Sequence, residues 1–205
     1  MELTNVYIGF ALATFAGLST GIGSLLGLYS KFENKRLLAL ALGFSAGVMI
    51  YVSFMELLLL SFDSLGGLYG DTYGKLIGVT SFTGGLLTML FIDQLFDHHS
   101  IADFISRSSD KEESLLVRTG VFSALALAIH NFPEGFATFT AAVYDPTVGA
   151  TLATAIAIHN IPEGLAVSVL IYYATKNKTK AFMISFASGL AEPLGALIGF
   201  LIFRT

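Results

Sequence analysis

The chain has 205 residues, of which 54% are hydrophobic and 13% charged, with a net charge of −4 and a mean hydropathy of +0.74. These values lie outside the range of soluble globular domains, so we expect membrane lipid as the environment and no nucleic-acid partner. Cysteine is absent, which excludes a disulfide framework and a thiolate metal site. We therefore predict an all-α integral membrane protein with one transmembrane domain, residues 1–205.

Six apolar runs follow one another along the chain, each about twenty residues or longer and able to cross roughly 30 Å of hydrocarbon as a helix. They are residues 6–29, 37–60, 75–96, 119–143, 147–173 and 181–203. Buried helices of a large soluble core would need polar faces that these runs lack. The first run has no basic stretch before it and no cleavage pattern after it, so we expect it to remain as a helix rather than to be removed as a signal peptide.

The Lys and Arg residues are unevenly distributed between the connections. Nine of the eleven lie between runs one and two, three and four, or five and six: Lys31, Lys35, Arg36, Arg107, Lys111, Arg118, Lys176, Lys178 and Lys180. The positive-inside rule then places these three connections in the cytoplasm and the amino terminus outside the cell (inner) membrane. The connection at 97–118 is polar and rich in Ser, and it predicts a mobile cytoplasmic loop.

Two segments place glycines one helical turn apart, Gly23 with Gly27 and Gly43 with Gly47. Such spacing allows helix backbones to approach closely in a membrane. Glycine is also tolerated elsewhere in membrane helices, and both interpretations of these two pairs stay open.

The pattern His-Asn-x-Pro-Glu-Gly occurs twice, at 130–135 and at 159–164. In each copy His and Glu are four residues apart and share one helical face, whereas Asn points about 100° away. Proline cannot donate its backbone hydrogen bond, so Pro133 and Pro162 predict kinked helices with an unpaired carbonyl at the depth of the histidine.

Three carboxylates are expected near the middle of the bilayer. Glu134, Glu163 and Glu192 are separated by 29 residues each, and the helices that carry them alternate in direction. A carboxylate at this depth costs about 2.5–3.5 kcal/mol on insertion scales, which marks such a residue as a functional candidate. Imidazole with carboxylate suits zinc, iron, manganese or cobalt, and several carboxylates could bridge two ions. A packing role alone is disfavoured by the repeated pattern.

These motifs, with "SGLAEPLGALIG" at 188–199 and "LGFSAGVM" at 42–49, resemble the ZIP family of divalent metal transporters, in particular its bacterial zinc-uptake permeases. The resemblance implies a bundle of eight membrane helices, of which six are expected in this chain, and a two-metal centre. It implies that one metal position is formed by Met49, His130, Glu134, His159 and Glu163. The second would use Asn131, Asn160 and Glu192, with Glu134 and Glu163 as bridges.

Other polar residues have two interpretations each. Glu56 and Asp63 could attract cations at the outer end of the second helix, or be ordinary interfacial carboxylates. Met49 is a ligand only by the resemblance, since methionine in a membrane helix usually packs. Four residues are expected at the cytoplasmic end of the third helix: Asp93, Asp97, His98 and His99. They could receive an ion that leaves the membrane, or they could be ordinary solvated residues.

Transport of a divalent metal into the cytoplasm accounts best for the repeated prolines and the deep carboxylates. An intramembrane metal hydrolase is the enzyme alternative, but the pattern H-E-x-x-H is absent. A proton or ion relay or sensor is the third. We expect no enzyme activity and no catalytic cofactor, with zinc, iron or manganese as substrate and a homodimer as one expected assembly. Metal preference and proton coupling stay open.

Overall fold

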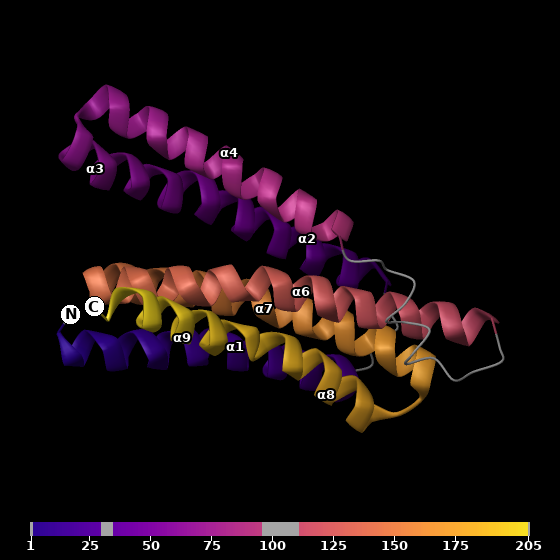
Figure 1. Ribbon diagram of the computed structural model, residues 1–205. Helices are drawn as coiled ribbons and strands as arrows, with labels where there is room; N and C mark the ends of the chain where they lie inside the picture. The colour runs from indigo at the N-terminus through magenta and orange to yellow at the C-terminus, as the bar shows by residue number, and fades with distance from the viewer. Residues whose placement is uncertain (1, 30–34, 96–110, 205) are drawn as a thin grey trace. The chain divides into compact units, whose positions relative to one another are not determined.

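The computed structural model describes residues 2–29, 35–95 and 111–204, and every regular element within these ranges is a helix (Figure 1). The chain forms two compact units. The first comprises residues 1–46 and 99–205, and the second residues 47–98. The expectation of an all-α membrane protein is confirmed.

The first unit is a bundle of long helices whose neighbours are distant in sequence. Its helices are α1 (Leu3–Tyr29), the first part of α2 (Lys35–Tyr51), α6 (Lys111–Tyr144), α7 (Pro146–Thr175), α8 (Lys178–Gly189) and α9 (Ala191–Phe203). Helix α1 packs along α7, α6 packs along both α7 and α9, and α8 packs against α1 and α7. In Figure 1 the amino end of α1 and the carboxyl end of α9 lie at the same end of this bundle. Consequently α1 runs parallel to α7, and α6 runs parallel to α8 and α9.

Local sequence explains the sharp turns between these helices. Asp145 alone separates α6 from α7, and its carboxylate accepts a hydrogen bond of 2.7 Å from the Thr147 backbone N–H, while Pro146 occupies the first helical position. Lys176 ends α7 in the left-handed region with φ 50°. Asn177 then caps α8 through the backbone N–H of Lys180. Both connections are therefore short, as antiparallel neighbours require.

The last predicted span, 181–203, is interrupted at Leu190, which ends α8 and precedes α9. Pro193 explains the interruption, because it has no N–H to donate to the carbonyl of Gly189, four residues before it. The break places Glu192 in the first turn of α9. The predicted single helix is therefore two helical segments with the carboxylate next to the break.

The second unit is a hairpin of two helical rods. The end of α2 continues through a π-helix at Val52–Leu57 into α3 (Leu58–Tyr69), so the span expected at 37–60 extends further and changes its hydrogen-bonding pattern midway. Helix α4 (Asp71–Leu95) returns after Gly70, whose φ of 83° favours glycine. Gly74 and Gly78 let α4 pack closely on α3.

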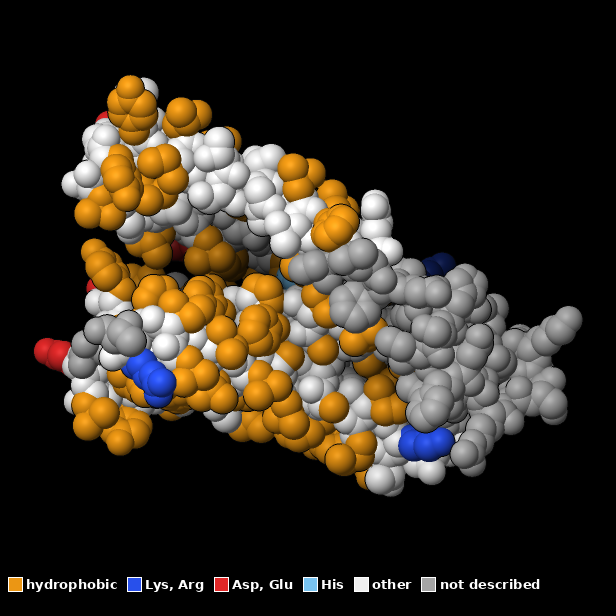
Figure 2. Space-filling model, viewed as in Figure 1, with side chains coloured by type: hydrophobic (Ala, Val, Ile, Leu, Met, Phe, Trp, Pro, Cys, Tyr) orange, Lys and Arg blue, Asp and Glu red, His pale blue; other side chains and the backbone are white. Residues whose placement is uncertain are grey.

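Five helical segments in the described ranges are long and apolar enough to cross a membrane: Leu3–Tyr29, Leu42–Tyr69, Asp71–Phe91, Pro146–Thr175 and Lys178–Phe203. Helix α6 contains the remaining predicted span, 119–143, the fourth along the chain. It is 34 residues long, but it carries charged residues at its start and the polar motif in its middle, so it is not among the five. Large apolar side chains such as Phe15, Ile22 and Leu201 point outward. Figure 2 shows hydrophobic side chains over much of the visible surface of α1, α8 and α9.

The predicted loop at 97–118 needs correction at its end. Helix α6 begins at Lys111, so residues 111–118 are helical rather than part of a loop. Residues 97–110 lie outside the described part of the chain. The basic residues Lys111 and Arg118 therefore belong to the first turns of a helix.

Candidate metal centre

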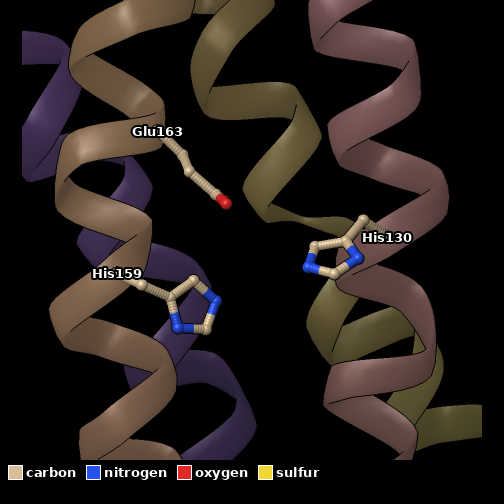
Figure 3. A group of neighbouring side chains, drawn as sticks. All are labelled: His130, His159 and Glu163. Carbon is tan, nitrogen blue, oxygen red and sulfur yellow. The ribbon is translucent and has the colours of Figure 1, made fainter. Parts of the chain in front are cut away.

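The two copies of the repeated motif lie side by side on α6 and α7. Each helix continues through its proline, Pro133 or Pro162, as one α-helix. Figure 3 shows His159 and Glu163 extending from α7 toward His130 on α6. One potential ligand atom from each of these three side chains lies within 4.8 Å of the others. The equivalent faces of the two motifs therefore meet.

Glu134 joins the two imidazoles. Its Oε1 lies 3.1 Å from Nε2 of His130 and 3.2 Å from Nε2 of His159. The side chain of His159 is 2% exposed and that of Glu134 17%, whereas that of His130 is 37% exposed. One carboxylate oxygen thus lies between two imidazoles from neighbouring helices, with the carboxylate of Glu163 close by.

The ring of His159 is oriented by its own helix. Its Nδ1 lies 3.1 Å from the carbonyl of Ala155, which can only accept a hydrogen bond, so Nδ1 carries the proton. In a neutral imidazole, Nε2 then has the lone pair that a metal ion binds. Ser45 of α2 donates its hydroxyl to the carbonyl of His159 at 3.3 Å. Ser45 was not among the predicted site residues, although it lies inside the motif at 42–49.

Three further polar side chains predicted as ligands are fully buried. Asn131, Asn160 and Glu192 each have an exposed fraction of 0%. The amide of Asn160 donates to the Glu192 carboxylate and, at 3.0 Å, to the carbonyl of Ala16. The amide of Asn131 donates to the carbonyl of Ser188 at 3.3 Å. These bonds use the N–H groups and fix the orientation of both amides.

The oxygens of these three side chains remain available. Within the described residues, no hydrogen-bond partner is present for Oδ1 of Asn131, Oδ1 of Asn160 or Oε2 of Glu192, all of them buried. Buried polar atoms without a partner are uncommon, and each requires a physical explanation. Two neutral oxygens and one carboxylate oxygen are a suitable ligand set for a divalent cation.

Comparison with known proteins identifies the family. A model of the ZIP zinc transporter family matches residues 97–204. The zinc transporter ZupT of Chlorobium chlorochromatii (strain CaD3) is 49% identical over 207 residues, covering 98% of this chain and 77% of the relative. The chain belongs to the ZIP family.

Two further relatives agree with this assignment. The zinc transporter ZupT of Lysinibacillus sphaericus (strain C3-41) is 49% identical over 205 residues, which cover 97% of this chain and 76% of the relative. That of Clostridium perfringens (strain 13 / Type A) is 43% identical over 221 residues, or 99% of this chain and 78% of the relative. ZIP is a family of transporters, so the prediction of a transport protein rather than an enzyme is confirmed.

Other predicted residues of this ZIP chain lie in the second unit or are not described. Met49 is partly buried and belongs to the second unit, and its ligand role stays a prediction. Glu56, in the π-helix, and Asp63, in α3, are exposed. Asp93 lies in α4, but its side chain is not described, and three other candidates lie outside the described residues: Asp97, His98 and His99.

The glycine pairs of this ZIP chain differ in their surroundings. Gly23 packs against the backbone of Ile161, and Gly27 against α7 near Ser168, which confirms close helix packing for that pair. Gly43 and Gly47 have no described atom within 4 Å of the position a Cβ would take. The sequence did not reveal that the first pair borders the metal centre, because the contacting residues are on α7.

Proposed function

We propose that this protein transports zinc across the membrane into the cytoplasm, and that its transport site holds two metal ions. The observation that carries the proposal is the convergence of His130, His159 and Glu163 with the shared carboxylate of Glu134, inside helices of a membrane protein. Two imidazoles with carboxylates and no thiolate form a ligand set that zinc accepts. The printed names of the relatives describe zinc transporters, which supports zinc as the substrate.

The first metal position would use nitrogen and oxygen ligands. We assign it to Nε2 of both His130 and His159 and to the carboxylates of Glu134 and Glu163, with Met49 as an additional ligand. An imidazole protonated at both nitrogens would donate from Nε2 to Glu134 and compensate its buried charge. A bound cation would replace these contacts with metal–ligand bonds. The site can therefore exist with and without its substrate.

The second metal position would use oxygen ligands alone. We assign it to the side-chain oxygens of Asn131, Asn160 and Glu192 that lack hydrogen-bond partners among the described residues. Glu134 and Glu163 each have a second buried carboxylate oxygen without a partner there, which supports their role as bridges between the two positions. This position would accept harder ions such as manganese more readily than the first.

The proposed direction of transport rests on the resemblance to zinc-uptake permeases, and the orientation of the chain is predicted from its basic residues. Their concentration in alternate connections places the amino terminus outside and the odd connections in the cytoplasm of the cell membrane. Glu56 would then lie toward the outer side, where a carboxylate raises the local concentration of cations.

Uptake of radioactive zinc into cells that express the protein tests the proposal. We expect Glu134→Ala to abolish uptake, because the carboxylate contacts both imidazoles. Asp71→Asn is the matched control, since this carboxylate is exposed at the start of α4 and pairs with Lys75 at 2.9 Å. Normal uptake by Glu134→Ala, at equal amounts of protein in the membrane, would contradict the proposed site.

A further inference from the structure

The helix pair α1–α7 and the helix pair α9–α6 make the same contacts. The motif glycine Gly164 faces the backbone carbonyl of Thr20, and Gly135 faces that of Glu192. In the motif copy on α7, Asn160 donates to the carbonyl of Ala16, which lies four residues before Thr20. The other copy repeats this bond, because Asn131 donates to the carbonyl of Ser188, four residues before Glu192.

A third contact is also repeated in the two helix pairs. The carbonyl of Ile161, the variable position of the motif, faces Gly23, three residues after Thr20. The carbonyl of Phe132, the variable position of the other copy, faces Gly195, three residues after Glu192. The two helix pairs are therefore related by an approximate two-fold axis that exchanges α6 with α7 and α9 with α1.

Gly17 and Gly189 locate this axis. They are three residues before Thr20 and Glu192, respectively, and each faces the carbonyl of the other. Because the two-fold rotation exchanges Gly17 with Gly189, the axis passes between these two glycines. The same operation exchanges Asn131 with Asn160. A cation held by both amides must lie on or near the axis, at similar distances from the two members of every exchanged pair.

Thr20 is thus the counterpart of Glu192. Both side chains are 0% exposed. Glu192 accepts a hydrogen bond from Asn160, whereas the hydroxyl of Thr20 has no partner among the described residues. The Thr20 side chain lies over Gly189, whose lack of a Cβ leaves room for it, since a methyl group there would be 2.9 Å from Oγ1. Leaving a buried hydroxyl without a partner is unfavourable, so this group is expected to have a partner when the site is loaded.

We propose that Thr20 is a further residue of the transport site, whose hydroxyl holds a water ligand of the cation at the second metal position. A direct bond between the Thr20 hydroxyl and the cation is less suitable. Glu192, the counterpart of Thr20, reaches the cation with a carboxylate, and the threonine side chain is two bonds shorter than that of glutamate. A bridging water supplies the missing length at little cost in enthalpy. Because Thr20 contributes a neutral hydroxyl where Glu192 contributes a carboxylate, the site carries less negative charge than it would with two carboxylates. This lower charge helps the site to release the cation. This inference rests on the second metal position of the proposed function.

Manganese and zinc binding to the purified protein in detergent tests the role of Thr20. Thr20→Val keeps the shape and removes the hydroxyl, and we expect manganese affinity to fall about three- to tenfold, the equivalent of one hydrogen bond of about 0.5–1.5 kcal/mol. Thr20→Ser should retain the affinity of the parent protein. Without metal, the melting temperature of Thr20→Val should equal or exceed that of the parent, because an unpaired buried hydroxyl is gone. Ser19→Ala is the control, since the neighbouring hydroxyl is buried and bonded within its own helix to Ala16.

Two other variants separate the possible failures. If Glu192→Gln weakens manganese binding and Thr20→Val does not, Thr20 is not part of the site, although the second metal position stands. If Glu192→Gln also binds normally, the second position itself is wrong. A loss in Thr20→Ser as large as that in Thr20→Val would show that keeping the hydroxyl does not preserve binding, and it would overturn the role of the hydroxyl.

Discussion

Gly164 allows α1 and α7 to contact each other at the metal centre, and Gly164→Ala should separate them. The added Cβ would lie 2.9 Å from the carbonyl carbon of Thr20 and 3.1 Å from its Cα, and closer still to its carbonyl oxygen. Ordinary contacts begin at 3.4 Å. Because these are backbone atoms, no rotamer change can relieve the overlap, and one helix must move away by about 0.5 Å or more.

The expected cost follows from two opposing terms. Overpacking in a close-packed core typically destabilises by about 1–3 kcal/mol. Alanine is intrinsically a better helix former than glycine by about 1 kcal/mol, which offsets part of that cost. Metal binding must also restore the displaced geometry, since the neighbouring Glu163 is a proposed ligand. We expect zinc affinity to fall about tenfold, equivalent to about 1.4 kcal/mol.

Thermal unfolding and zinc titration of the purified protein measure both effects. Gly67→Ala is the matched control, because Gly67 is exposed in α3 and has no described atom within 4 Å of the position of a Cβ. Gly135→Ala should behave like Gly164→Ala, since its Cβ would meet the backbone of Glu192 in the same way. If Gly164→Ala unfolds and binds zinc like Gly67→Ala, the close contact of α1 with α7 is not what positions the ligands.

Three other outcomes are expected. The double variant His130→Ala with His159→Ala should lose much more zinc affinity than manganese affinity in competition binding, because nitrogen ligands favour zinc; equal losses would reassign the imidazoles to packing. Glu163→Ala should abolish zinc uptake while inserting normally into the membrane, since removing a midplane charge favours insertion, and unimpaired uptake would exclude a bridging role. A tag at Lys178 should be protected from impermeant reagents in intact cells and one at Asp145 should be labelled; the reverse pattern would invert the orientation.

The sequence by itself determined the features that depend on neighbouring residues along one helix. Hydropathy located the long helices, and the spacing of four placed His130 with Glu134, and His159 with Glu163, on common faces. It also placed the three carboxylates Glu134, Glu163 and Glu192 at a similar depth, because each is 29 residues from the next. The break between α8 and α9 was missed, although Pro193 was its visible signal.

Only the tertiary structure decided which groups surround the motifs. The bond from Asn160 to the carbonyl of Ala16 joins residues 144 positions apart, and backbone carbonyls carry no signature of their partner in the sequence. The position of Thr20 opposite Glu192 likewise depends on glycines that let α1 approach α7, where any side chain would hold the backbones apart. A hydrophobic helix can pack in many registers, and the contacts between glycine and carbonyl select one of them.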